Sequence, residues 1–318
     1  MKKEKRLYTG KYVRRVWAAY VLAGFCLVTV FWRAPAVLAA PESATVVVPI
    51  QAHPALWTIH GTSATAYLFG SVHLLPPNVE WRTPQIDAAM AASETFVFEA
   101  PTDHAGIGAI GNFIRAHGML PEGTLLPSLL DEQTLQDYNK ALAVTHVPAR
   151  SVVRFRPWLA GLVLELAYIR SEHYDPDSGI DRQVYAIAKG EGKSVRYFET
   201  VNQQMSLMMP ESSKSEVEEF DATLKSFESE SSVLAPLIDA WAHADEATVA
   251  KLMNADLEAV PGARKALLDD RNQAWVGELK EMLTEPHTFF ITVGAGHLAG
   301  SGGLPALLRK AGYQVDGP

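Results

Sequence analysis

The 318 residues include 28 Lys and Arg, 36 Asp and Glu, and a single cysteine, Cys26, and the net charge is −8. An acidic chain is a poor nucleic-acid binder, because phosphate binding needs clustered cations. Since Cys26 lies in the N-terminal apolar segment, the rest of the chain has no thiol for a disulfide, a cysteine nucleophile or a thiolate metal site.

The first 39 residues have the order of a secretory signal peptide. Basic residues precede the apolar run 16–32, and small residues follow in "APAVLAAPE", where cleavage after Ala39 is expected. The mature protein would then be periplasmic or secreted. The apolar run is long and Arg33 follows it, so the alternative is an uncleaved anchor that contacts the membrane only through this segment.

Loss of residues 1–39 would also change the charge. That segment holds 8 basic residues and 1 acidic residue, so 20 basic and 35 acidic residues remain, a net charge of −15. No later apolar run is long enough to span a bilayer. Residues 40–318 are therefore expected to form a single domain, which is a feasible size for an α/β fold.

The N-terminal part of this domain has an α/β pattern. "LWTIHGTSATAYLFG" predicts two short strands joined around residues 61–63, and the second strand ends in Gly70-Ser71-Val72-His73. Helical spacing follows over residues 84–94, and "TFVF" predicts a further strand that is closed by Glu99. Strand, helix and strand in this order are typical of a βαβ unit.

Helical patterns dominate the middle of the chain, with insertions at about 104–176 and 205–282. The stretch 157–172 is apolar on most faces, which predicts a buried helix, and "SSKSEVEEF" predicts an exposed, acidic helix start. Between the insertions, Asp181 is expected to cap a helix, and "SVRYF" to form a strand closed by Glu199. "HTFFITVGAGH", "LPALLRKAG" and "YQV" predict a final strand, helix and strand. The fold class is therefore α/β, with a central mixed sheet built from N- and C-terminal βα units.

Three polar residues follow apolar strands: His73, Glu99 and His297. Gly70 and Gly294 stand three residues before the two histidines, where glycine permits a tight turn. Sites of parallel α/β sheets gather at the carboxyl ends of strands. Two histidines and one carboxylate are the ligand set of an open catalytic metal site, which suits zinc, manganese or iron. Each element alone is weak, because one such histidine is usually a loop residue and one such glutamate a cap or ion pair.

A second interpretation of the C-terminal motif is a dinucleotide site. Gly294, Gly296 and Ala299 fit G-x-G-x-x-A after a strand, and Asp316 stands near the expected acidic position. The match ends two residues before the end of the sequence, and His297 would lie where the pyrophosphate packs. This interpretation is the minor alternative.

Arg271 is a further candidate, in the helical stretch "LLDDRNQAWVGEL". It could pair with Glu99 or Glu199, or stabilise an oxyanion. The competing interpretation is a surface pair with Asp269 or Asp270.

These motifs resemble the TraB/GumN family, which includes the Tiki proteases. The resemblance covers residues 54–316 and rests on "YLFGSVHLLP", "FVFEAP", "RPWLAGLVLELA", "GIDRQVYAIAKGEGKSVRYFET", "DDRNQAW" and "TFFITVGAGHLAGSGGLPALLRKAGYQV". It implies a fold related to erythromycin esterases and ChaN-like haem-binding proteins. It also implies a site of His73, His297 and Glu99, with Arg271 as the family arginine and Glu199 as an additional acid.

Because Tiki proteins are metal-dependent proteases, the resemblance implies an exported metal-dependent hydrolase of peptide or amide bonds. His73, His297 and Glu99 would hold manganese, cobalt or zinc, Glu99 or Glu199 could act as general base, and Arg271 would stabilise an oxyanion or orient a carboxylate. The alternative is a non-catalytic periplasmic binding protein for a peptide signal or haem. The partner is then a peptide or small molecule rather than nucleic acid.

Overall fold

The computed structural model describes residues 49–318, except residue 211 and the ranges 228–233 and 258–261. The predicted signal peptide, residues 1–39, lies outside the described residues. Within the described ranges, none of the helices combines the length and apolar character needed to cross a membrane.

A mixed six-stranded sheet forms the centre of the α/β part, in the order β6-β5-β7-β3-β2-β8. The strands are β2 (Leu56–His60), β3 (Thr65–Ser71), β5 (Thr95–Phe98), β6 (Ser194–Tyr197), β7 (Thr288–Gly294) and β8 (Gln314–Asp316). Neighbours from β6 to β3 are parallel, whereas β2 is antiparallel to β3 and to β8. The prediction of a mixed sheet from both ends of the chain is confirmed. A separate parallel pair joins β1 (Ile50–Gln51) and β4 (Val79–Glu80).

The central pair β3 and β7 joins the two ends of the chain. Their register runs from Thr65 beside Thr288 to Ser71 beside Gly294. The strands that precede the two histidine motifs are therefore nearest neighbours in the sheet. Both Gly-x-x-His motifs therefore lie at the carboxyl ends of adjacent parallel strands, offset by one residue in the register.

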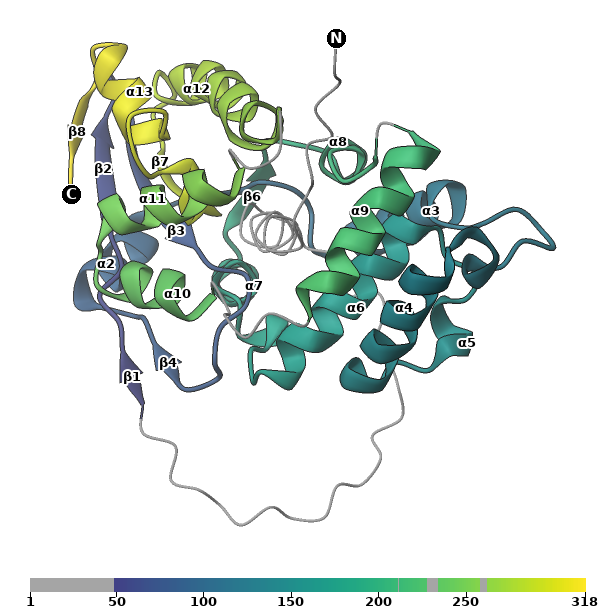
Figure 1. Ribbon diagram of the computed structural model, residues 1–318. Coiled ribbons are helices and arrows are strands. Elements are labelled where there is room, and N and C mark those ends of the chain that lie inside the picture. The colour runs from purple at the N-terminus through teal and green to yellow at the C-terminus, as the bar shows by residue number, and fades with distance from the viewer. Residues whose placement is uncertain (1–48, 211, 228–233, 258–261) are drawn as a thin grey trace, which may run out of the picture.

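Helices cover both faces of the sheet (Figure 1). One face packs against α12 (Asp270–Met282) and α13 (Leu304–Lys310) through a core that includes Trp275, Leu279 and Leu304. The other face packs against α2 (Pro84–Ala92), α7 (Ile180–Gly190), α10 (Leu234–Ala242) and α11 (Glu246–Leu257). Strand side chains alternate between these two cores, because successive residues of a strand point to opposite faces.

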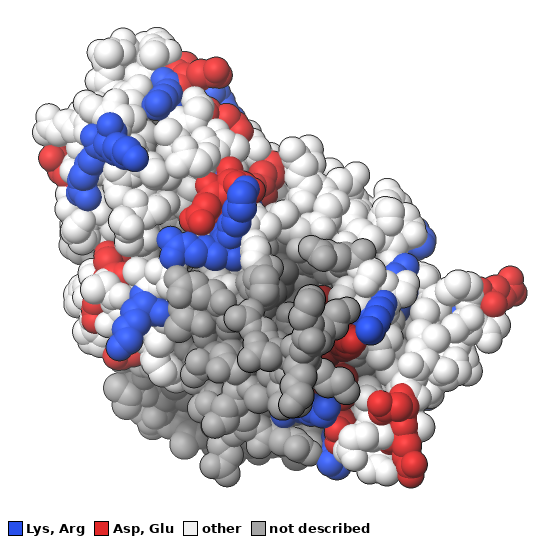
Figure 2. All heavy atoms as spheres, turned by 45° about the horizontal axis from the view of Figure 1, so that its top comes forward, with Lys and Arg blue, Asp and Glu red and all other residues white. Residues whose placement is uncertain are grey.

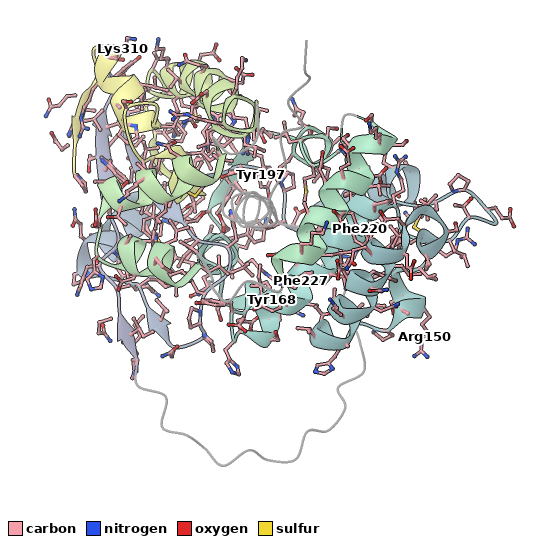
Figure 3. All side chains as sticks on the ribbon, viewed as in Figure 1. Arg150, Tyr168, Tyr197, Phe220, Phe227 and Lys310 are labelled. Carbon is pink, nitrogen blue, oxygen red and sulfur yellow. The ribbon has the colours of Figure 1, made fainter. Side chains whose placement is uncertain are left out.

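The helical middle of the chain lies beside the sheet (Figure 1). It comprises α3 (His104–His117), α4 (Glu132–Thr145), α5 (Ala149–Val152), α6 (Pro157–Ser171), α8 (Val201–Ser206) and α9 (Ser213–Ser226). As predicted, α6 is buried on most faces. Figure 3 shows Phe220 and Phe227 beside α6, where the rings of Phe227 and Tyr168 lie 5.2 Å apart. Short single-turn helices occur at η2 (Leu126–Leu129), η3 (Pro176–Ser178), η4 (Lys265–Asp269) and η5 (Ala295–His297).

Two local predictions need correction. The start of α9 is exposed at residues 212–214, as predicted, but Glu216 in its first turn is buried and pairs with Arg156 at 2.6 Å. Asp181 does not cap α7: the helix begins after Gly179, without a side-chain cap, and Asp181 is buried in the first turn. Both carboxylates are held inside by tertiary ion pairs, which helical periodicity does not reveal.

The surface shown in Figure 2 mixes the two signs of charge. On its described part, Lys and Arg side chains lie among Asp and Glu side chains, without a broad region of either sign. This face therefore lacks the continuous cationic patch that phosphate backbones bind.

Candidate active site

The predicted site residues follow four adjacent parallel strands at one end of the sheet. Glu199 follows β6, Glu99 follows β5, Gly294 ends β7 and His73 follows β3. The backbone N–H of Glu199 donates to the carbonyl of Glu99 at 2.8 Å, which continues the β5–β6 ladder to this end. The carboxyl ends of the strands therefore bring together residues more than 200 positions apart in the sequence.

Arg271 of α12 joins the two glutamates. Its Nη2 donates to Oε2 of Glu99 at 2.6 Å, and its Nε donates to Oε1 of Glu199 at 2.7 Å. A third bond runs from Nη2 to Oε2 of Glu199 at 3.0 Å. The predicted pairing with Glu99 and Glu199 is confirmed, and the guanidinium is 5% exposed. The surface pair with Asp269 or Asp270 was the wrong alternative.

The remaining N–H groups of Arg271 also have acceptors. Nη1 lies 3.1 Å from the carbonyl of Leu267 and 3.0 Å from Nε2 of His297. The guanidinium carbon stands 4.6 Å from the ring centre of Trp275. Because a guanidinium has five N–H donors, all of them are engaged within the protein.

His297 is fully buried and both of its ring nitrogens have partners. Nδ1 lies 2.6 Å from Oδ1 of Asn272, and the amide of Asn272 donates to the carbonyl of Gly302 at 2.8 Å. An amide oxygen can only accept, so Nδ1 of His297 carries the proton and Nε2 accepts from Arg271. The ring also packs on Trp275, with centroids 4.4 Å apart. His297 is thus a neutral imidazole with a defined tautomer.

Glu99 is buried and fully bonded. Oε1 accepts from the backbone N–H of Gly294 at 2.7 Å, and Oε2 accepts from Gln204 at 3.1 Å as well as from Arg271. Burial raises the pKa of Glu99 above its usual value, against the opposing effects of Arg271, His73 and the Gly294 N–H. Gly294 therefore has a role beyond its turn: its N–H holds the central carboxylate.

His73 forms a second buried pair with Asp181 of α7. Nδ1 of His73 contacts Oδ2 of Asp181, and both side chains are buried. Burial lowers the pKa of His73, but the carboxylates of Asp181 and Glu99 outweigh it, so that the pKa lies above its usual value. Nε2 of His73 is buried and has no hydrogen-bond partner. Among the predicted ligand atoms of His73, Glu99 and His297, it is the one without a hydrogen-bond partner in the described part of the chain.

The predicted metal ligands do not fit a metal ion as they are arranged. Over the described part of the chain, no group of three His, Cys, Asp or Glu side chains could hold one. The physical reason is that Arg271 donates to Nε2 of His297, the ring nitrogen that a metal would need, and Asn272 occupies Nδ1. The donor types suit manganese, cobalt or zinc, so the metal stays a prediction from the resemblance.

The local geometry also differs from a dinucleotide fingerprint. The turn after β7 is the short helix η5, and α13 begins only at Leu304. The α-helix N-terminus that would bind a pyrophosphate therefore does not follow the glycines directly. Asp316 of the edge strand β8 pairs with His60 of the neighbouring strand β2 at 2.8 Å.

Three residues around the site were not predicted as members of it. Asn272 follows Arg271 directly, Trp275 lies one turn later, and Asp181 stands in "GIDRQ". Its position next to Arg271, on a helix that packs against the sheet, was a signal that could have marked Asn272 as part of the site. Nothing in the sequence pattern indicated that Asp181 contacts His73, because the two lie 108 positions apart and meet only through the fold.

Comparison with known proteins supports the resemblance. Residues 55–317 match the family described as TraB/PrgY/gumN. The protein YbaP of Shigella flexneri is 23% identical over 256 residues, which is 77% of this chain and 88% of that protein. YbaP of Escherichia coli (strain K12) is 23% identical over 255 residues, covering 76% and 87%. Neither name states an activity, and no solved structure matches the chain.

Proposed function

The chain belongs to the TraB/PrgY/gumN family, and from this premise we propose that it is an exported hydrolase that cleaves a peptide or other amide bond. The family match covers the whole α/β part, including every predicted site residue. Family membership does not specify a reaction. The reaction proposed here depends on the chemistry that the buried side chains can perform.

The observation that carries the proposal is the pair of His73 and Asp181. A carboxylate that contacts Nδ1 orients an imidazole and leaves Nε2 as the atom that exchanges protons. Nε2 is buried and has no protein partner. In the proposed reaction, Nε2 takes a proton from a water molecule as the water oxygen bonds to the carbonyl carbon. The same proton then passes to the leaving nitrogen as the C–N bond breaks.

Arg271 acts as a positioning residue in this scheme. Because its five N–H groups already bond to protein acceptors, it cannot donate to an oxyanion without losing one of them. Its charge still stabilises negative charge nearby, and it holds Glu99 and Glu199 in place. Glu199 is the most exposed member of the cluster at 11%, which suits a carboxylate near the substrate.

No step of this scheme passes through a metal ion, since the ligand set is not assembled. The resemblance nevertheless predicts metal dependence, and the test therefore includes it. Purified mature protein is assayed on a peptide library with and without manganese, cobalt or zinc, and its metal content is measured.

The decisive variants are His73→Ala and Asp181→Asn. Loss of a general base lowers turnover about 10²- to 10⁴-fold. The matched control is His60→Ala, since His60 also pairs with an aspartate, Asp316, but on the exposed edge of the sheet. Equal turnover by wild type and His73→Ala would contradict the proposal, and so would a wild type that turns over no peptide.

A binding protein is the second candidate, favoured by the same unpartnered Nε2 of His73. A buried imidazole with an open nitrogen can ligate haem iron. A Soret band in the haem-loaded protein that disappears in His73→Ala, without peptide turnover, would identify this function.

A further inference from the structure

Two further buried polar atoms at the same end of the sheet lack a partner. They are Oγ of Ser71, at the end of β3, and Oγ1 of Thr292, near the end of β7. The two residues are 1% and 0% exposed. Neither belongs to the cluster around Arg271, and neither has a role in the scheme above.

The two hydroxyls lie on the same face of the sheet. Phe69 and Phe290 pack ring to ring across the two strands, with centroids 5.8 Å apart. Ser71 and Thr292 stand two residues beyond them, so they point to the same face, because strand side chains repeat every second residue. This face also carries α7, whose first turn supplies Asp181.

The register shows which residues stand beside these hydroxyls. The β7 residue paired with Ser71 is Gly294, which has no side chain. Thr292 lies two residues before Gly294, on the same face of the sheet as Ser71. Two residues after Ser71, Nε2 of His73 is also buried without a partner. Three polar atoms with open hydrogen-bonding capacity are therefore gathered where β3 and β7 end.

Packing does not account for hydroxyls at these two positions. On the same face of the sheet, the β3 residue paired with Thr292 is Phe69, which is apolar and fully buried. Valine has the shape of threonine and would fill the same space without a buried hydroxyl that lacks a partner. Because buried polar groups are normally satisfied, a buried hydroxyl without a partner is a candidate contact for a bound water or ligand.

We propose that Ser71 and Thr292 bind the hydrolytic water and present it to Nε2 of His73, an inference that rests on the proposed function. A buried water needs two to four polar partners, and these three atoms supply them. Each hydroxyl can donate or accept, so the pair holds the water while one of its protons is directed at Nε2. The water oxygen then forms the bond to the substrate carbonyl carbon, and the proton transfers to His73.

The test uses Thr292→Val and Ser71→Ala in the full mature protein. Each variant is expected to lower kcat about a hundredfold with little change in KM, as loss of one aligned hydrogen bond does at other catalytic sites. The melting temperature of Thr292→Val is expected to equal or exceed that of wild type, because the substitution removes a buried hydroxyl without a protein partner. A purely structural threonine would instead lower the melting temperature and leave kcat unchanged.

The matched control is Thr223→Val, which is equally buried but whose hydroxyl donates to the carbonyl of Glu219 at 2.9 Å. This variant should keep the wild-type kcat. Unchanged kcat in both Ser71→Ala and Thr292→Val would overturn the inference.

A crystal structure of the wild type at high resolution separates this inference from the proposed function. A water bonded to the hydroxyls of Ser71 and Thr292 supports the site even if no peptide is cleaved. A dry gap between them overturns it even if the protein is an active hydrolase. The structure of Thr292→Val should show that water lost or displaced.

Discussion

Nδ1 of His297 and Oδ1 of Asn272 lie 2.6 Å apart, in a part of the protein closed to solvent. The amide nitrogen of Asn272 donates to the carbonyls of His297 and Gly302, which fixes the orientation of the amide. The proton of the imidazole is therefore on Nδ1, and Nε2 is an acceptor for Arg271. Asn272 thus fixes the tautomer of His297, and this tautomer provides the acceptor for Arg271. The sequence patterns had given Asn272 no role.

Replacement of Asn272 by Leu is expected to destabilise the fold. It leaves the Nδ1–H of His297 and the carbonyl of Gly302 unpaired, and each buried unpaired group costs about 1–3 kcal/mol. The free energy of unfolding from urea titration measures the loss. The exposed Asn202 of α8 provides the control substitution, Asn202→Leu, which should change it by less than about 0.5 kcal/mol. If Asn272→Leu lowered the free energy of unfolding by no more than the Asn202→Leu control, this account would be contradicted.

Arg271→Met is expected to cost about 3–5 kcal/mol of stability at pH 8, because it leaves the buried carboxylate of Glu99, and the partly buried carboxylate of Glu199, without a cation. Without Arg271 the pKa of Glu99 rises further, and protonation then removes the uncompensated charge. The loss should therefore be smaller at pH 5 than at pH 8.

The control for this prediction is Arg196→Met. Arg196 also bonds a carboxylate with two nitrogens, at 2.8 Å each to Glu285, but on the exposed surface. Exposed ion pairs contribute about 0–1 kcal/mol. Equal losses in the two variants would show that burial of the Arg271 cluster does not matter for stability.

Glu246 should make stability depend on pH. Burial, with a smaller effect from Asp245, raises the pKa of Glu246 to about 7, whereas the unfolded group titrates near 4.5. The native state therefore binds the proton more tightly, and stability that is complete below about pH 4.5 is lost as the pH rises to about 7. Glu246→Gln should raise the melting temperature at pH 8 but not at pH 4.5.

The chain contains a matched control for this substitution. The start of α4, "DEQT" at 131–134, repeats the start of α11, "DEAT" at 245–248, and in both the aspartate accepts from the threonine N–H. Glu132 is exposed where Glu246 is half-buried. Glu132→Gln should leave the pH profile unchanged. If the two variants shift the profile alike, burial of Glu246 is not the cause.

Gly179→Ala should displace His73. A Cβ at residue 179 would stand 2.4 Å from the carbonyl oxygen of His73, a backbone atom that cannot rotate away. The expected cost is about 1–3 kcal/mol, with loss of the proposed peptide turnover because His73 shifts from Asp181. Gly190→Ala at the other end of α7 meets nothing within 4 Å and should be neutral or slightly stabilising. Wild-type turnover in Gly179→Ala would show that this contact does not position His73.

Much of the fold was predictable because it depends on local patterns. Short apolar runs predicted β3, β5 and β7, and the long apolar stretch predicted the buried helix α6. The strand-end positions of His73, Glu99 and His297 followed from the same patterns, since parallel strands end at a common edge. The helix cap predicted at Asp181 was wrong and the burial of Glu216 was not predicted, because each carboxylate pairs with a residue from a distant segment.

The sequence by itself determined the fold class, the family and the identity of the acidic, basic and imidazole groups that gather at the sheet. Only the tertiary structure decided how these groups bond. It bonds Arg271 to Glu99, Glu199 and His297, which leaves His73 as the imidazole with an open nitrogen. The physical reason is that hydrogen bonds and ion pairs are satisfied by groups close in space, whereas sequence periodicity records only which face of an element is buried.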